Sequence, residues 1–215
     1  MDVAPTRLYL VRHGATAANE QVPFVLQGDG LDLPLSPAGE QQAQEAGRQL
    51  GGLPIAACYS SPMWRARQTA AVIAETFPLP IQTVPGLQEC NVGLWQGLDW
   101  ETISRRYPLE YAAFRADPVQ VPMLQGESLG QMRARILPAV EPLLTRHAGE
   151  SIVIVAHKLT LAVLISCLAN RELHLAGQIA IPNCSIHLAE RLGLAESVVS
   201  PAWDVRLWNA EDSGR

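Results

Sequence analysis

The segment SIVIVA, from Ser151 to Ala156, most constrains the fold of this 215-residue chain. Its centre is apolar at every position, which is typical of a central strand covered on both faces. A helical stretch, Leu159 to Leu168, follows it. The same order of strand and helix occurs twice earlier in the chain, at Leu8–Val11 with Ala38–Leu50 and at Ile55–Tyr59 with Trp64–Phe77. This alternation predicts an α/β fold, a three-layer sandwich with a mainly parallel central sheet flanked by helices.

The other elements are expected around this framework. They are a short strand at Ile81–Val84, a helix at Glu127–Arg146 that Pro138 should bend or restart, and late strands at Ser185–Ala189 and Asp204–Trp208. Residues 91–127 break the alternation and are rich in Trp, Tyr and Phe, which predicts a small cap over one end of the sheet. We therefore expect residues 1–215 to form one domain, with a cap segment at about 91–127.

Composition excludes several classes of protein. A net charge of -5 argues against nucleic acid or an anionic membrane as partners, so an anionic substrate must be attracted by a local cluster of cations. The four cysteines form no CxxC pair, which argues against a zinc site and favours reduced thiols in a cytoplasmic protein. The first residues lack the apolar run of a signal peptide, and Leu159–Ala169 is too short to span a bilayer.

Charged and polar side chains follow the predicted strands, where open α/β sheets bind their ligands. Arg12 and His13 come after the first strand, Arg65 after the second, Glu89 after the third and His157 after SIVIVA. Each position alone is unremarkable. Because the carboxyl ends of parallel strands meet at one edge, we expect these five side chains to lie together.

These residue types suit phosphoryl transfer. The flat guanidinium group of arginine matches phosphate oxygens and stays charged at any working pH. Imidazole is a good nucleophile near neutral pH, and a covalent intermediate divides one difficult displacement into two easier ones. A carboxyl group can protonate the leaving oxygen and then accept a proton from water.

The sequence LYLVRHGATAANE, residues 8–20, contains the pattern RHGxT at Arg12–Thr16, followed by Asn19. Further motifs follow in order: SSPMWRARQTA at 60–70, LQECNVGLWQGL at 87–98, the triplet GES at 126–128 and IVIVAH at 152–157. Together they resemble the histidine phosphatase superfamily, the phosphoglycerate mutase-like proteins, over nearly the whole chain. RHG alone is a weak signal, whereas the ordered set is strong.

The resemblance implies a role for each matching residue. It makes His13 the nucleophile that becomes phosphorylated and Glu89 the proton donor and acceptor. It makes Arg12 and Arg65 ligands of the phosphoryl oxygens, and His157 the fourth wall of the phosphate pocket. Asp99 and Glu101 are competing carboxylates for the role of the acid.

Three more residues are expected to contact the substrate on the same ground. Asn19 is a further phosphate contact, and Gln27 with Gly28 lines the entrance. No metal ligands and no organic cofactor are implied.

The chain departs from the family pattern at Lys158, since a glycine usually follows the second histidine. We expect the Lys158 side chain to face away from the phosphate, because a third cation would bind the product too tightly. His147, His174 and His187 lie outside any motif and are expected to be non-catalytic. Arg67, two residues from Arg65 on the same helix, should face solvent or a salt bridge.

Three functions compete. The first is a phosphatase that acts on a small phosphorylated metabolite, the second a cofactor-dependent phosphoglycerate mutase, and the third a non-catalytic phosphate-binding protein. Mutases of this family carry a longer insertion between the acid and the second histidine, whereas only 67 residues separate Glu89 from His157 here. The short cap favours the phosphatase. Neither the substrate nor the oligomeric state follows from the sequence, although the strand near Trp203–Trp208 could pair two copies in a homodimer.

Overall fold

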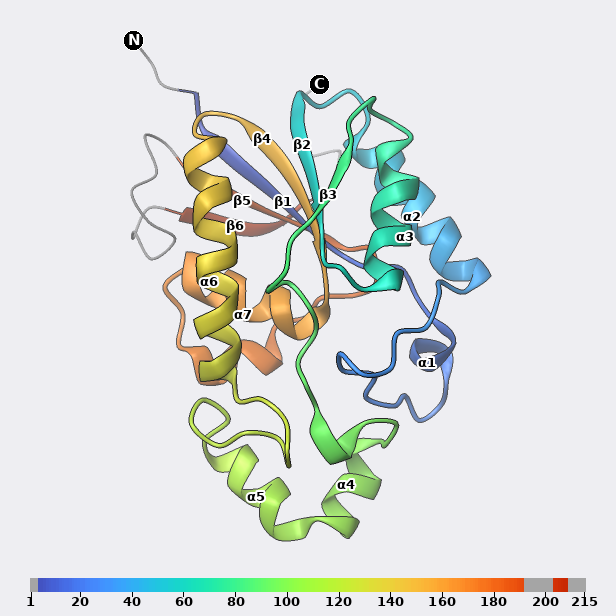
Figure 1. Ribbon diagram of the computed structural model, residues 1–215, viewed down its shortest axis with the longest axis vertical. Coiled ribbons are helices and arrows are strands. Elements are labelled where there is room, and N and C mark those ends of the chain that lie inside the picture. Colours follow the sequence, from blue (N-terminus) through green and yellow to red (C-terminus); the bar gives the residue numbers. More distant parts are fainter. Residues whose placement is uncertain (1–3, 192–202, 209–215) are drawn as a thin grey trace.

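A single six-stranded sheet forms the centre of the molecule in the computed structural model, which describes residues 4–191 and 203–208 (Figure 1). The strand order is β3-β2-β4-β1-β5-β6. The strands are β1 Thr6–Arg12, β2 Ile55–Ser60, β3 Ile81–Thr83, β4 Ser151–Ala156, β5 Ile186–Arg191 and β6 Trp203–Trp208. The first four strands are mutually parallel, and β5 and β6 pair antiparallel. The mainly parallel sheet predicted from the sequence is confirmed.

Helices cover both faces of the sheet, so the molecule has three layers (Figure 1). One face packs against α2 and α3, and the other against α6 and α7. The helices are α1 Ala17–Glu20, α2 Pro37–Leu50, α3 Trp64–Ala74, α4 Trp100–Arg106, α5 Pro108–Ala116, α6 Leu129–Arg146 and α7 Lys158–Leu168, with 3-10 turns η1 Gly93–Trp95 and η2 Leu173–Gln178. The predicted three-layer architecture is confirmed.

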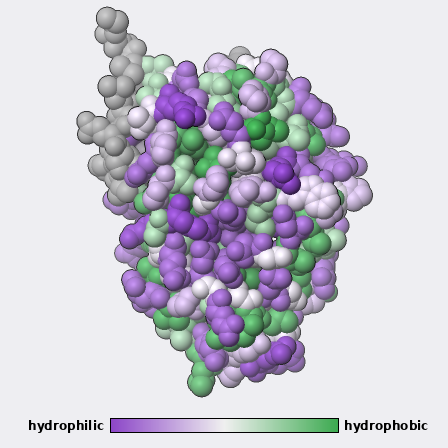
Figure 2. Space-filling model, viewed as in Figure 1, coloured by the Kyte–Doolittle hydropathy of each residue, from purple (hydrophilic) through white to green (hydrophobic). Residues whose placement is uncertain are grey.

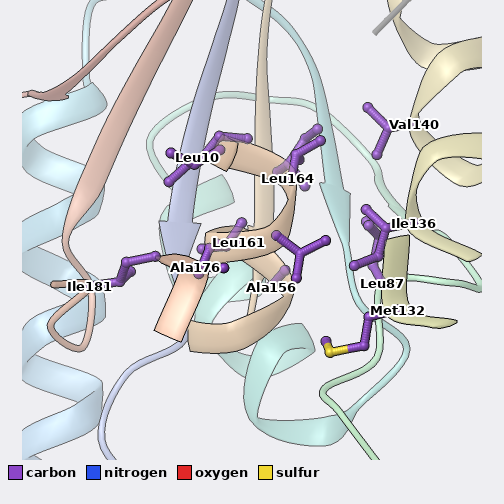
Figure 3. Packing of buried hydrophobic residues seen from close by; sticks show 14 of the residues in the cluster. Leu10, Leu87, Met132, Ile136, Val140, Ala156, Leu161, Leu164, Ala176 and Ile181 are labelled. Atoms are coloured by element: carbon purple, nitrogen blue, oxygen red, sulfur yellow. The ribbon is translucent and has the colours of Figure 1, made fainter. Parts of the chain in front are cut away.

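The packing of β4 explains why the centre of its sequence is apolar at every position. Ile152, Ile154 and Ala156 point to the layer of α6 and α7, whereas Val153 and Val155 point to the layer of α2 and α3. Figure 3 shows Ala156 beside Leu161 and Leu164 of α7, with Ile136 of α6 nearby. Both faces of the strand are therefore buried, and each fully buried aliphatic side chain contributes about 1.5–3 kcal/mol.

Helix α6 differs from the sequence-based prediction at Pro138. It runs unbroken from Leu129 to Arg146 with Pro138 and Pro142 inside it, so Pro138 does not restart it. Each proline removes one backbone hydrogen bond, but the face with Met132, Ile136 and Val140 is fully buried in the core. This tertiary packing holds the helix together across both prolines, because most helical stability in proteins comes from the buried face.

Residues 91–127, the cap segment, contain η1, α4 and α5 and lie at one end of the molecule (Figure 1). Trp95 is completely buried and packs edge-on against Trp100 and Phe114, and Tyr111 completes the cluster. Edge-to-face packing of aromatic rings is favourable beyond the burial of their area. The aromatic residues of the segment thus hold its two helices to each other.

The surface, the helices and the edge of the sheet bear on the membrane and on a second copy of the chain as possible partners. Hydrophilic residues predominate across the middle of the face in Figure 2. Among the helices in the described ranges, none is long and apolar enough to cross a membrane. Strand β6 forms one edge of the sheet, and its pairing in a homodimer stays a prediction.

Candidate active site

The pairing of β1 with β4 brings two histidines side by side. Arg12 lies opposite Ala156 in the parallel register, so the next residue of each strand, His13 and His157, are neighbours. Their ring centroids are 5.1 Å apart, and the His13 amide donates a hydrogen bond of 2.9 Å to the Ala156 carbonyl. The chain after β4 crosses to the opposite face of the sheet from the chains after β1 and β2. Such a crossing point opens a crevice at the carboxyl ends of the strands, where ligands bind.

The hydrogen bonding of His13 identifies its reactive nitrogen. Its Nδ1 lies 2.7 Å from the Gly14 carbonyl oxygen, which can only accept a hydrogen bond, so Nδ1 carries the proton. The lone pair therefore resides on Nε2, which accepts a bond of 3.3 Å from Arg65 Nε. Burial, followed by the charges of Arg65 and Arg12, lowers the pKa of His13 well below its ordinary value of 6.5. The ring is thus neutral and nucleophilic near pH 7.

Arg65 is held rigidly at the base of the crevice, with only 1% of its surface exposed. Its Nη2 donates to the Gly28 carbonyl at 2.8 Å, and its Nη1 donates to the Leu31 carbonyl at 3.0 Å and to Asp32 at 3.3 Å. Arg12 donates from Nη1 to the Ile181 carbonyl at 2.9 Å, and its buried Nε has no partner in the described residues. Unpartnered buried donors are costly unless a ligand accepts from them.

Gln27 and Gly28 form the turn that orients Arg65. Gly28 has a φ of +58°, and a Cβ at this position would lie 2.6 Å from Val92 Cγ2. Only glycine therefore fits there, and its carbonyl can face the guanidinium group. Gln27 accepts a bond of 3.0 Å from the Thr16 hydroxyl. Asn19 joins the same network, because its Oδ1 accepts from the Thr16 amide at 3.1 Å, and it also lines the cavity.

His157 is held by a residue that the sequence analysis did not assign. Its Nε2 lies 2.8 Å from Ser61 Oγ, and its Nδ1 is buried without a partner in the described residues. Burial, followed by the charge of Arg65, lowers the pKa of His157 well below 6.5. Ser61 directly follows β2, just as His13 and His157 follow their strands, so the rule used for the histidines would have found it.

Glu89 lies against the N-terminus of α7. Its carboxylate accepts bonds from the amides of Leu159 and Thr160, each at 3.2 Å, and from the Cys90 amide at 2.9 Å. These amides fix the position of the carboxyl group at the start of the helix. Of the competing carboxylates, Asp99 instead caps α4 by accepting from Thr102, and Glu101 is exposed on the same helix.

Arg135 of α6 clamps the loop that carries Glu89. All five of its donors are used, because it pairs with both oxygens of Glu127 at 2.8 and 2.9 Å and donates to the carbonyls of Gly86, Gln88 and Glu89. Glu127 of the GES triplet also accepts from the Asn91 amide at 3.0 Å. The sequence analysis missed this clamp, since an arginine inside an amphipathic helix carries no motif of its own.

One cavity of about 390 Å³ collects most of these groups. Its inner part is lined by all the predicted site residues except His157, namely Arg12, His13, Asn19, Gln27, Gly28, Arg65 and Glu89. His157 is completely buried beside His13 and supports the floor of the cavity. The outer wall is mostly apolar and comes largely from the cap segment and α7; it includes Trp100, Phe114, Met123 and Leu159.

Lys158 was expected to face away from the phosphate, and this stays a prediction. It lines the cavity, where the charges of Arg12 and Glu89 act on it. As the first residue of α7, it starts a regular helix without the glycine that is usual in the family. Arg67 is exposed, as expected. His174 also lines the outer cavity, where it pairs with Glu172 at 3.3 Å.

Comparisons with known proteins agree with this geometry. Residues 8–203 match the family model of the histidine phosphatase superfamily (branch 1). Phosphoserine phosphatase 1 of Hydrogenobacter thermophilus is 29% identical over 188 residues, which cover 86% of this chain and 88% of that protein. The metal-independent phosphoserine phosphatase of Arabidopsis thaliana is 36% identical over 157 residues, 71% of this chain and 64% of that protein.

Among solved structures, a mycobacterial glucosyl-3-phosphoglycerate phosphatase superposes with a TM-score of 0.82 at 29% identity, covering 95% of this chain and 99% of that one. Another relative is named a phosphoglycerate mutase-like protein. The matched region, residues 8–203, extends over most of the chain and includes the residues that line the cavity. This chain therefore belongs to the histidine phosphatase superfamily, as its motifs predicted.

Proposed function

We propose that the protein is a phosphatase that hydrolyses a small phosphomonoester through a phosphohistidine intermediate on His13. The observation that carries this proposal is the neutral His13 ring, whose Nε2 lone pair lies in the cavity next to Arg65. Relatives named as phosphatases support hydrolysis over phosphoryl transfer between hydroxyls.

In the first step, His13 Nε2 attacks phosphorus, and the bond from phosphorus to the ester oxygen breaks. Arg12, Arg65, His157 and Asn19 bind the phosphoryl oxygens, so that the unpartnered donor on Arg12 Nε gains an acceptor. The tautomer of His157 that carries its proton on Nδ1 donates to a phosphoryl oxygen as well. Most of the catalytic effect comes from positioning and from preorganised charge. The guanidinium groups supply that charge without a metal, in keeping with the metal-independent activity named for the plant relative.

Glu89 is the proton donor of this step and the base of the next. It protonates the leaving oxygen and is then ionised, which prepares it to accept a proton from water. That water attacks phosphorus, the bond to Nε2 breaks, and inorganic phosphate leaves with His13 neutral again. The amides of Leu159 and Thr160 fix the carboxyl group for both steps.

We also propose the cytoplasm as the place of action. All four cysteines lie in the described residues and are free thiols, which supports a reducing compartment. The substrate is then one of the small phosphorylated metabolites found there.

The test of this function replaces the nucleophile. His13→Ala should lower kcat for p-nitrophenyl phosphate by several orders of magnitude, because it removes the covalent route. Rapid quenching of the wild type with labelled substrate should trap an acid-labile, base-stable phosphoenzyme that the variant does not form. Arg67→Gln, on the exposed side of α3, is the matched control and should keep normal turnover. Near-normal turnover by His13→Ala would overturn the proposal.

A further inference from the structure

Lys158 occupies a position that is electrostatically unfavourable for a lysine. It is the first residue of α7, where the helix dipole presents positive charge, and it lies near the Arg12 guanidinium group. Its side chain remains exposed to solvent, but partial desolvation, followed by the charge of Arg12, lowers the pKa of Lys158 from its ordinary value of 10.5. Within residues 4–191 and 203–208, no carboxylate forms an ion pair with its ammonium group, and Glu89 attracts it only at longer range.

The phosphoryl group does not account for this cation. Its two negative charges are matched by Arg12 and Arg65, which line the cavity, and the unpartnered Arg12 Nε offers it a further donor. Lys158 lines the same cavity at the start of α7, where the charge of Glu89 acts on it. Arg115 of α5 adds a second cation to the outer cavity. Among the described residues that line the cavity, Glu89 alone is acidic.

We propose that Lys158 binds a second anionic group of the substrate, and that this group is a carboxylate. The proposal rests on the proposed phosphatase function and narrows it to phosphomonoesters that carry a carboxylate. The single charge of one ammonium group matches the single charge of a carboxylate, whereas a second phosphate carries nearly two negative charges near neutral pH. Residues that are unfavourable for the fold are expected where a ligand compensates them.

The experiment compares two substrates that differ at one group. 3-Phosphoglycerate carries a carboxylate where glycerol 3-phosphate carries a hydroxymethyl group. Lys158→Gln should reduce kcat/KM for 3-phosphoglycerate at least tenfold more than kcat/KM for glycerol 3-phosphate, which corresponds to about 1.4 kcal/mol. Most of the loss should be in KM. Lys158→Arg, which keeps the charge, should restore most of the difference, and Arg67→Gln should alter neither substrate.

The same variants are also to be tested by inhibition, so that the comparison does not depend on turnover of 3-phosphoglycerate or glycerol 3-phosphate. 3-Phosphoglycerate should inhibit hydrolysis of p-nitrophenyl phosphate by the wild type more strongly than glycerol 3-phosphate does, and Lys158→Gln should remove most of this preference. Equal losses on both compounds would show that Lys158 contacts the phosphoryl group, and unchanged constants would show that it contacts no substrate group. Either result overturns the proposal.

Two further outcomes distinguish failure of the carboxylate proposal from failure of the proposed phosphatase function. A larger loss on fructose 1,6-bisphosphate than on fructose 6-phosphate, with no loss specific to 3-phosphoglycerate, would replace the carboxylate with a second phosphate and overturn the carboxylate assignment. Absence of any phosphatase activity in the wild type, with p-nitrophenyl phosphate included, would instead overturn the proposed function itself.

Discussion

The hydrogen bond from His13 Nδ1 to the Gly14 carbonyl determines both the tautomer and the protonation state of the nucleophile. Because burial and two arginines lower its pKa, His13 should stay neutral as the pH falls through 6.5. ¹⁵N NMR of the histidine rings should therefore show a protonated Nδ1 and a bare Nε2 from neutral pH to below 6. The lowered pKa of His13 also affects the pH dependence of stability, in the direction opposite to that of a histidine in a favourable ion pair. The unfolded chain takes up this proton below pH 6.5 and the folded one does not, so His13 lowers stability as the pH falls. A His13 resonance that titrates at or above 6.5 would contradict this assignment.

Glu89 gives the second prediction at the scale of single residues. Protonation of the leaving oxygen matters most when the leaving group is poor. Glu89→Gln should therefore reduce kcat for an alkyl phosphate by about 10²–10⁴-fold. It should reduce kcat for p-nitrophenyl phosphate much less, because that leaving oxygen needs little protonation. Equal losses on both substrates would assign Glu89 to binding and would leave the acid unidentified.

At the scale of elements, the clamp between α6 and the Glu89 loop predicts coupled effects on stability and catalysis. Arg135→Met leaves Glu127 half-buried without its partner, which should lower the free energy of unfolding by about 3 kcal/mol. Urea denaturation measures this loss. Relative to the wild type, the variant should also lose more kcat with an alkyl phosphate than with p-nitrophenyl phosphate, because the loop that positions Glu89 is released. Arg135→Lys should rescue part of both effects, and a loss of stability alone would reduce the clamp to a structural role.

The same clamp has a defined pH dependence. Burial by itself would raise the pKa of Glu127, but hydrogen bonds from Arg135 and the Asn91 amide outweigh it, so the pKa lies below its ordinary value of 4.5. The stabilisation is therefore present above pH 4.5 and is lost as the pH falls through the lower, folded value. Below pH 4.5, the wild type should lose stability more steeply than Arg135→Met.

At the scale of the whole molecule, the short cap separates hydrolysis from mutase chemistry. A transferase protects its phosphohistidine by excluding water. The cap segment here adds only η1, α4 and α5 over the cavity, so water should reach the intermediate. With 3-phosphoglycerate as substrate, we expect release of free phosphate without a requirement for 2,3-bisphosphoglycerate. Rapid formation of 2-phosphoglycerate, with phosphate release slower by about a hundredfold or roughly 2.7 kcal/mol in barrier, would identify a mutase instead.

The motifs and the periodicity of the chain were enough to predict the layers of the fold and the residues that meet at the cavity. The reason is that both depend on local properties. An apolar run such as Ser151–Ala156 has to be buried on both faces, and the residue after each parallel strand has to emerge at the same edge. His13 and His157 follow from that rule alone, and the RHGxT pattern added the expected chemistry.

The tertiary structure decided the features that depend on contacts between distant segments. Pro138 was expected to bend or restart α6; it does not restart the helix, because burial of Met132 and Ile136 keeps it continuous. Arg135 reaches a loop that lies more than forty residues earlier in the chain, which no local pattern encodes. For Lys158, the sequence states only that a cation follows His157. Whether that cation points into the cavity depends on how α7 packs on the sheet, and this is a property of the assembled layers.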